Sequence, residues 1–408
     1  MNESLWLDEA TTALVSRMSL SDIFTKFLPG DFHPPFYYVF MKFWVNIFGS
    51  SEIALRTPSL IFALLTVFIV YKLAGKFAAL ILGSNPLFIY YSQEARMYMM
   101  TAFLVTTLIY TYSRKRWVWF AFLLATLGMT DYIALFILPI FIILDYKNIK
   151  KLILNSSLLI ISYLLWLPIF IKQLSNGLGV GDAWANLLGQ PTIKNFLLIP
   201  TKFMIGRVSF DPEWLYGLII IIIGGLYSYL LFRSISIIRS IRIIYLWLFV
   251  PVALGIIVSF WIPTLTYFRY LFVLPAFCIL VAYGIGRSRV FLYCVVFLNI
   301  LFSLYYIISP SFHREDWRSA AVAIGEDKII TPTGSQSEAL IYYNKDGNII
   351  SPQDLMANRY SLVWLSRYVW QVFDPEDVTR VKIEELGYKK VGEYNFRGVE
   401  FYKYAYRN

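Results

Sequence analysis

The chain has 408 residues, of which 58% are hydrophobic and only 15% are charged, and its mean hydropathy is +0.60. Apolar runs of roughly 17–20 residues recur along it, about the length that crosses ~30 Å of hydrocarbon. The formal net charge of +10 does not indicate a nucleic-acid partner, because the basic residues lie in short loops between these runs, where they orient membrane helices. The composition therefore predicts a polytopic α-helical membrane protein and excludes a nucleic-acid-binding one.

The N-terminal segment 1–53 comes first and contains two adjacent carboxylates, Asp8 and Glu9, in the stretch SLWLDEATTA. The aromatic run HPPFYYVFMKFWVNIFG at 33–49 is too short for a comfortable span and is rich in tyrosine and tryptophan, which favour the membrane interface. We expect a juxtamembrane helix there, lying at the outer surface. If it crossed the bilayer instead, the orientation of every later loop would invert.

About ten spanning helices follow, because apolar runs of spanning length recur from residue 54 onwards. The predicted spans are 54–74, 76–92, 95–113, 117–130, 131–146, 152–171, 213–232, 243–262, 268–286 and 290–308. Lysines and arginines cluster in alternate connections, which the positive-inside rule makes cytoplasmic. These clusters are Lys72 and Lys76; Arg114, Lys115 and Arg116; Lys147, Lys150 and Lys151; Arg233, Arg239 and Arg242; and Arg287 and Arg289. Segments 1–53, 92–98, 172–212, 263–270 and the region from 309 are then extracytoplasmic.

The composition changes at residue 309, where strand and helix patterns with frequent charges replace the apolar runs. We expect a small extracytoplasmic α/β domain at 309–408, after the transmembrane domain at 54–308 and the N-terminal loop at 1–53. Both cysteines, Cys278 and Cys294, fall in predicted spans, so the sequence suggests neither a disulfide framework nor a zinc site.

Several ionisable residues are predicted to lie at the outer boundary of the membrane: Asp8, Glu9, His33, Glu94 and Arg96. Charges near hydrocarbon are costly unless they are paired or hydrated, so their convergence in one cavity would indicate a functional site. The alternatives are ordinary: carboxylates at a helix start can be caps, and Glu94 with Arg96 can be a surface ion pair worth under ~1 kcal/mol.

Three ordered motifs, LWLDEA, HPPFYYVFMKFWVNIFGSSEIALRTPS and NPLFIYYSQEARMYMM, resemble the N-terminal signatures of the GT-C membrane glycosyltransferases. The resemblance is to the group that includes dolichyl-phosphate-mannose protein mannosyltransferases and lipid A aminoarabinose transferases, and it is recovered at REDWRSAA, 314–321. It implies transfer of a monosaccharide from a polyprenyl (dolichyl) phosphate to a protein, glycan or lipid acceptor. Relatives have a first spanning helix before the acidic motif, so we expect either a misplaced start or an N-terminus delivered outside unaided.

The resemblance also implies roles for the acidic residues. Asp8 matches the first acidic motif and would be the base that takes the acceptor proton, with inversion at the anomeric carbon. Glu9 would orient Asp8 or contact the acceptor, although a cap or a solvated carboxylate explains it equally well. Glu94 matches the second acidic motif and would hold hydroxyls of the sugar or acceptor.

Phosphate binding requires cations or hydrogen-bond donors, and Arg96, Arg269 and His33 are the candidates. Arg269 is expected at the start of an outer helix, where the helix dipole does not favour a cation, and a phosphate partner would explain it. The alternatives are an arginine that snorkels to the interface and a loop histidine with no role. Arg56 and Arg318 are weaker candidates, with interfacial anchoring and a surface salt bridge as their respective alternatives.

No metal site is indicated, because the acidic residues lack a D-x-D spacing, and we expect no cofactor, although Mg²⁺ or Mn²⁺ could be bound by oxygen ligands. Two other classes of function compete with the transferase. A secondary transporter would be expected to carry charges at the midplane and interrupted helices in matching halves. A membrane-anchored binding protein would leave the acidic motifs without a purpose. Each of these functions predicts a different assay result.

Overall fold

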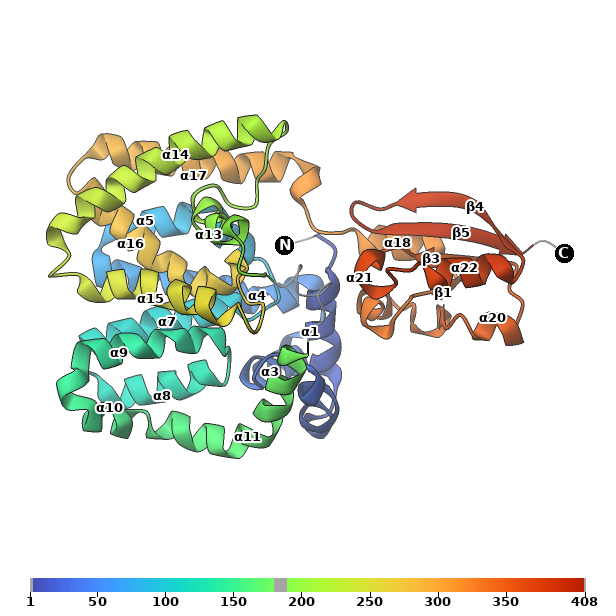
Figure 1. Ribbon diagram of the computed structural model, residues 1–408, viewed down its shortest axis with the longest axis horizontal. Helices are drawn as coiled ribbons and strands as arrows, with labels where there is room; N and C mark the ends of the chain where they lie inside the picture. The colour runs from blue at the N-terminus through green and yellow to red at the C-terminus, as the bar shows by residue number, and fades with distance from the viewer. Residues whose placement is uncertain (1–2, 180–188, 407–408) are drawn as a thin grey trace. The chain divides into compact units, whose positions relative to one another are not determined.

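The computed structural model describes residues 3–179 and 189–406, and the chain packs into two compact units (Figure 1). The α/β unit comprises Met1–Met18, Met41–Leu55 and His313–Asn408. The helical unit comprises Ser19–Phe40 and Arg56–Phe312. The predicted N-terminal segment 1–53 is therefore shared between the two units and does not form a part of its own.

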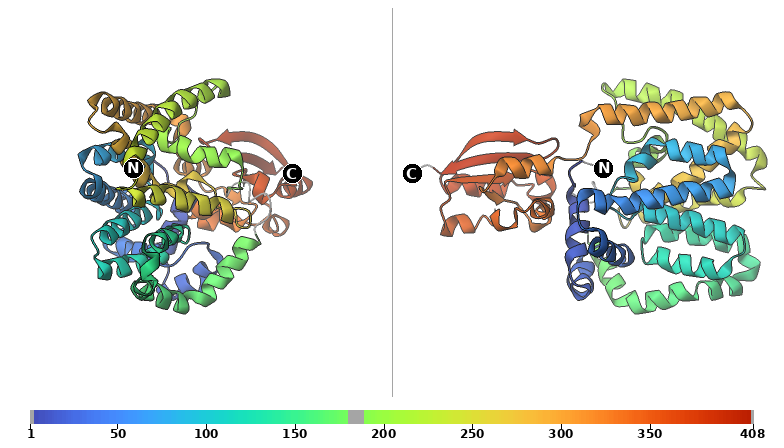
Figure 2. Two further views of the ribbon diagram at one scale, coloured as in Figure 1. Left: turned by 60° about the vertical axis from the view of Figure 1, so that its left-hand side comes forward. Right: turned by 180° about the vertical axis from the view of Figure 1, so that it is seen from behind.

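The helical unit contains helices that run alongside one another in Figures 1 and 2. Its helices are α2 (Leu20–Asp22), α5 (Lys76–Ser84), α6 (Pro86–Tyr91), α7 (Tyr98–Ser113), α8 (Trp117–Gly128), α9 (Leu138–Asp145), α10 (Ile149–Asn155), α11 (Ser157–Leu178), α13 (Ile193–Ile205), α14 (Glu213–Ser234), α15 (Arg242–Val258), α16 (Leu274–Ile285) and α17 (Arg289–Ile308). Helices α3 (Phe36–Phe48) and α4 (Glu52–Ala74) begin in one unit and end in the other. Short 3-10 turns include η2 (Leu28–Gly30), η3 (Ile133–Ile137) and η6 (Tyr267–Val273).

Five helical stretches of the described chain are long and apolar enough to cross a membrane. They are Glu52–Ala74, Ser157–Leu178, Glu213–Ile237, Tyr267–Ile285 and Arg289–Ile308, and the shorter apolar helices are Trp117–Gly128 and Arg242–Val258. Large apolar side chains such as Leu165, 83% exposed, face outward, as lipid-facing residues do. The chain is thus a multi-pass membrane protein, and the total of about ten spans stays a prediction.

The prediction of a single helix over 76–92 is wrong, because the helix is interrupted between α5 and α6. Pro86 has no amide hydrogen to continue the helix and disfavours a helical residue before it. The side chain of Asn85 caps the new start, since its Oδ1 accepts from the amides of Leu87 and Phe88, each at 3.1 Å. Its Nδ2 donates to the Phe203 carbonyl at 2.7 Å, which fixes the break against α13.

The predicted small α/β domain is present in the C-terminal region and is built on a five-stranded sheet (Figure 1). The strand order is β2-β1-β3-β5-β4, with parallel pairs up to β3 and antiparallel pairs beyond it. The strands are β1 (Lys328–Ile330), β2 (Ile349–Ile350), β3 (Leu362–Ser366), β4 (Tyr388–Asn395) and β5 (Glu400–Tyr406). The helices are α18 (Trp317–Ile324), α19 (Glu338–Tyr342), α20 (Asp354–Ala357), α21 (Trp370–Phe373) and α22 (Val378–Glu385).

The N-terminal helix α1 (Leu7–Arg17) belongs to this α/β unit and packs against α19. Its Ala10 is part of the same buried core as Trp317 and Leu340. The chain before it is also held by this unit, because the Leu5 amide donates to the Tyr343 hydroxyl at 2.9 Å. The first acidic motif is therefore anchored by the C-terminal domain.

Candidate functional site

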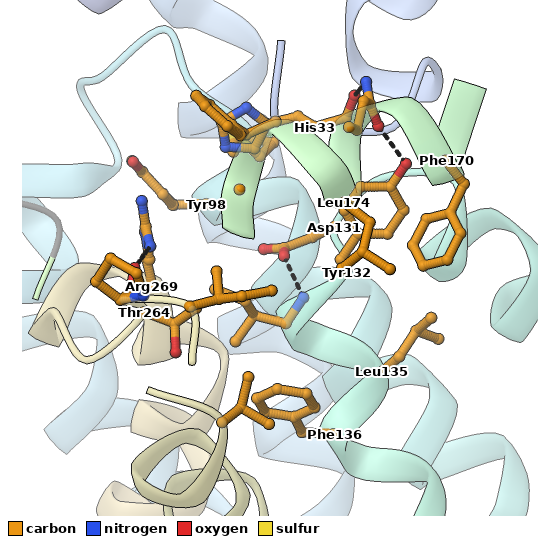
Figure 3. A pocket seen from close by; sticks show the side chains of 18 of the residues that line it. His33, Tyr98, Asp131, Tyr132, Leu135, Phe136, Phe170, Leu174, Thr264 and Arg269 are labelled. Atoms are coloured by element: carbon orange, nitrogen blue, oxygen red, sulfur yellow. Dashed lines mark hydrogen bonds between the residues drawn. The ribbon is translucent and has the colours of Figure 1, made fainter. Parts of the chain in front are cut away.

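A cavity of about 320 Å³ lies within the helical unit (Figure 3). Its walls are largely apolar and aromatic, and its polar side chains are few. The polar side chains include His33, Asp131, Gln173, Thr264 and Arg269, and the apolar ones include Leu135, Phe136, Phe170, Leu174 and Ile262. A concave apolar site with a few convergent polar groups is the usual form of a small-molecule binding site.

His33 enters the cavity from the loop that precedes α3, and it is paired with a neighbouring carboxylate. Its Nδ1 lies 3.3 Å from Oδ2 of Asp31. Burial alone would raise the pKa of the Asp31 carboxyl, but the charge and hydrogen bond of His33, together with the charge of Arg96, hold that pKa below its ordinary value. Asp31 is therefore an anionic partner for the imidazole, and it connects His33 electrostatically to Arg96.

Arg269 and Asp131 also reach the cavity, from η6 and from the turn before η3. The Arg269 guanidinium donates from Nη1 to the Pro263 carbonyl at 2.9 Å, a bond that holds the side chain along the cavity wall. Asp131 is only 6% exposed, and its Oδ1 accepts from the Ile133 amide at 2.9 Å. Figure 3 shows the Asp131 carboxylate directed into the space between His33 and Arg269.

A chain of partly buried hydrogen bonds joins α11 to the loop that carries His33. The Trp166 Nε1 donates to the Tyr132 hydroxyl at 2.7 Å, and that hydroxyl donates to Oε1 of Gln173. The Gln173 amide then donates to the carbonyls of Leu28 at 2.6 Å and His33 at 3.1 Å. Because each member is hydrogen-bonded, the network gives the His33 loop a fixed position.

Glu94 and Arg96 lie in the turn between α6 and α7, and both are buried, at 2% and 6% exposure. Ser59 on α4 donates to the Glu94 carbonyl, and the Arg96 amide donates to that same carbonyl at 2.9 Å. Neither side chain is part of the described cavity lining, but the charge of Arg96 acts on Asp31 next to His33. The helical unit thus brings His33 and Arg269 to one cavity and places Arg96 close to it.

A second charged group lies on α13 and the loop after it. The Lys202 ammonium is buried and donates to the Val208 carbonyl at 3.0 Å, while Arg207 lies over the Tyr90 ring at 4.7 Å. Burial, reinforced by the charge of Arg207, lowers the pKa of Lys202 to about 8. Two cations on one aromatic-lined segment were not predicted from the sequence.

Asp8 and Glu9 belong to the α/β unit, in the first turn of α1. Asp8 is half-buried and close enough to Glu338 and Tyr368 for its charge to act on both. Glu9 is fully buried, and its Oε2 lies 3.8 Å from Nε of Arg314. The predicted catalytic pair is therefore split, since Asp8 is accessible whereas Glu9 is part of the interior.

The weaker candidates lie elsewhere. Arg56 is fully buried on α4 in the helical unit. Arg318 forms an ion pair with Glu52 in the α/β unit, which is the alternative interpretation that its sequence position allowed.

Sequence reasoning missed Asp31, Asp131 and Gln173, which complete the polar end of the cavity. A signal for Asp131 was present, because a lone carboxylate at the junction of two apolar runs is costly and marks a functional position by default. Gln173 had no such signal, since an amide at a helix end is common.

The described residues contain no cluster of three or more histidine, cysteine, aspartate or glutamate side chains arranged to hold a metal ion. The expectation that the protein works without a metal cofactor stays a prediction.

Two solved structures share the fold over nearly the whole chain. The crystal structure of ArnT from Cupriavidus metallidurans in the apo state has a TM-score of 0.57 at 12% sequence identity, covering 99% of this chain and 94% of that one. The structure of ArnT from the same organism bound to undecaprenyl phosphate has a TM-score of 0.52, with the same identity and coverage. The fold is therefore ArnT-like, and this likeness together with a family-model match bears out the resemblance that the sequence motifs predict.

Part of the sequence also matches a protein family. Residues 32–175 match the family model of the dolichyl-phosphate-mannose-protein mannosyltransferases. This stretch includes His33, Glu94, Arg96 and Asp131, whereas Asp8 and Arg269 lie outside it. No curated protein matches the chain in sequence.

Proposed function

We propose that the protein is a glycosyltransferase that moves a monosaccharide, a hexose or pentose, from a polyprenyl phosphate to an acceptor hydroxyl at the extracytoplasmic face. The observation that carries the proposal is the cavity, which has His33 and Arg269 at a polar end and apolar walls beyond it. A lipid phosphate has the same two-part character, an anionic head and a hydrocarbon chain. The ArnT-like fold and the match over 32–175 support this substrate class.

The reaction needs a base for the acceptor proton and cations for the departing phosphate. The acceptor oxygen attacks the anomeric carbon, the bond from that carbon to the phosphate oxygen breaks with inversion, and the phosphate leaves with the electron pair. Asp8 takes the acceptor proton, and Glu94 orients sugar or acceptor hydroxyls. Arg269, His33 and Arg96 stabilise the phosphate. The acceptor is a protein, glycan or lipid, and no metal is invoked.

Glu9 has a different part in this proposal. Its burial beside Arg314 makes it a support for α1, so that it orients Asp8 from the interior. A direct contact between Glu9 and the acceptor is not part of the proposal, because the side chain is fully buried.

The test is to incubate the purified full-length protein in liposomes with a panel of polyprenyl-phosphate monosaccharides and to measure release of each labelled sugar from its carrier. Release of one sugar, dependent on Asp8 and on an added acceptor, is the expected result. Flux of a solute across the liposome without sugar release would favour a transporter. Binding of a lipid without turnover, under any acceptor tested, would favour a membrane-anchored binding protein.

A further inference from the structure

The position of Asp131 presents an electrostatic problem for an anionic ligand. Its carboxylate is 6% exposed, accepts backbone hydrogen bonds from the amides of Ile133, at 2.9 Å, and Ala134, and points into the cavity (Figure 3). A buried negative charge there repels the phosphate that His33 and Arg269 attract. The Asp131 charge therefore weakens the binding of every anionic ligand. A charge that opposes binding in this way is expected to serve a later step of turnover.

Several titratable groups face Asp131 from the elements packed around it, and the tyrosines Tyr98 and Tyr132 line the same cavity. His33 comes from the loop before α3, Arg269 and Tyr270 come from η6, and Tyr163 comes from α11; each is coupled electrostatically to Asp131. Of these groups, Arg269 carries a fixed positive charge, and the His33 imidazole can donate a hydrogen bond. Asp131 offsets part of the Arg269 charge, so the cavity is less positive than Arg269 alone would make it.

The donor and the product of the proposed reaction differ in charge at this point. A sugar linked through its phosphate to a prenol is a phosphodiester with one negative charge. After transfer the carrier is a phosphomonoester, whose second proton dissociates near pH 6, so it is largely doubly charged above neutral pH. Any fixed negative charge in the phosphate site therefore disfavours the product more strongly than the donor.

We propose that Asp131 is a specificity-determining residue that makes the cavity favour a singly charged phosphodiester over a doubly charged phosphomonoester, and so promotes release of the spent carrier. This inference rests on the proposed function. His33 and Arg269 attract the phosphate of both lipids. Asp131 repels the doubly charged phosphomonoester more strongly than the phosphodiester, and this difference distinguishes the two lipids.

The test compares the binding of polyprenyl monophosphate with that of a polyprenyl-phosphate monosaccharide in detergent at pH 8. In Asp131→Asn the amide oxygen can still accept from Ile133, so the geometry is kept while the charge is lost. The quantity compared is the ratio of the monophosphate affinity to the donor affinity. We expect this ratio to be roughly tenfold higher in Asp131→Asn than in the wild type, which is the size of effect that one close like charge produces. Asp131→Glu should keep the wild-type preference.

Asp145→Asn is the matched control, because Asp145 is a carboxylate of the same unit that accepts from Tyr112 at 2.8 Å outside the cavity lining. It should leave the ratio of the two affinities unchanged. At pH 5 both lipids carry about one charge, so the wild type and Asp131→Asn should then show the same ratio. Asp131→Ala provides a second neutral variant if the asparagine protein does not fold.

The outcomes separate this inference from the proposed function. If the wild type binds neither lipid, the proposed function fails, and the inference fails with it. If the wild type binds both lipids but the neutral variants keep the wild-type ratio at pH 8, the proposed function stands and the role of Asp131 is overturned. If the neutral variants change the affinity ratio equally at pH 5 and pH 8, the role of Asp131 is also overturned. The extra charge of the product would then not be the cause of the change.

Discussion

The buried carboxylates Glu9 and Asp131 lie in two different surroundings, one in the α/β unit and one in the helical unit. Glu9 is fully buried beside Arg314 in a unit where charged pairs are common, including Arg318 with Glu52 and Arg367 with Asp377. Asp131 is almost as buried but faces a cavity with largely apolar walls. In the first unit a buried charge holds two elements together, and in the second it faces a space in which a ligand fits.

The surroundings of a buried carboxylate therefore determine which role its charge can have. A carboxylate that has an arginine beside it in a polar domain needs no ligand to explain it. A carboxylate among apolar walls is expensive unless its charge serves binding or catalysis. Burial also separates adjacent residues within the α/β unit, since Asp8 is half-buried whereas Glu9 is fully buried beside Arg314.

The largest effect is expected for Asp8→Asn, which should reduce sugar transfer by roughly 10²–10⁴-fold because the general base is lost. Donor binding should stay close to that of the wild type, since the cations of the helical unit are untouched. The measurement is single-turnover release of labelled sugar, with donor affinity determined separately. Wild-type turnover in this variant would remove Asp8 from the mechanism.

Glu9→Gln should act mainly on stability. Removing one partner of a buried ion pair typically costs about 3 kcal/mol, because the other charge is left poorly compensated. We expect a lower thermal unfolding temperature in detergent, and the double variant Glu9→Leu with Arg314→Leu should recover part of the loss. A stable Glu9→Gln protein that has lost transfer would instead show that Glu9 takes part in the reaction.

Arg269→Ala should raise the apparent KM for the lipid donor by roughly tenfold to a hundredfold, as expected when a charge-assisted phosphate contact is lost. The acceptor KM should change little, and lysine should restore only part of the effect because it lacks the guanidinium fork. Arg233→Ala is the matched control, since Arg233 is an exposed arginine of the same unit that lies over the Tyr229 ring at 5.8 Å. Equal effects in both variants would make Arg269 an interfacial anchor.

The smallest effect concerns Lys202, whose pKa is lowered to about 8 by burial and by the charge of Arg207. The unfolded chain holds this proton to higher pH than the folded one, so stability should rise as the pH increases from about 8 towards the ordinary lysine value of about 10.4. Lys202→Met should abolish that rise. The check is the unfolding temperature of both proteins between pH 7 and pH 10, and an unchanged slope would assign the rise to another group.

Much of the helical unit could be predicted from the sequence, because length and hydropathy decide where a helix can cross a membrane. The predicted spans 54–74, 213–232 and 290–308 match α4, α14 and α17 to within a few residues. The break before α6 depended on Asn85 and Pro86, whose local chemistry overrides the apolar pattern. Such interruptions are easy to miss, since hydropathy averages over them.

The candidate site was predicted only in part. The position of His33 and Arg269 at the outer boundary predicts a role for both, and the structure brings both to one cavity. Their proximity to Asp131 depends on packing between η6, η3 and the loop before α3, and no short-range pattern records such packing. The burial of Glu9 could not be predicted for the same reason, because its partner Arg314 lies about 300 residues further along the chain.

The hydrogen bonds that hold the N-terminal residues have a consequence for how the protein is made. Leu5 and Ser4 bond to the Tyr343 hydroxyl at 2.9 Å and 3.1 Å, and that partner follows them by 338 and 339 residues in the chain. At a ribosomal rate of about 5–20 residues per second, roughly tens of seconds separate the two ends of these bonds. The position of the acidic motif is therefore fixed only after Tyr343 has been synthesised, so the N-terminal residues take their final place together with the C-terminal domain.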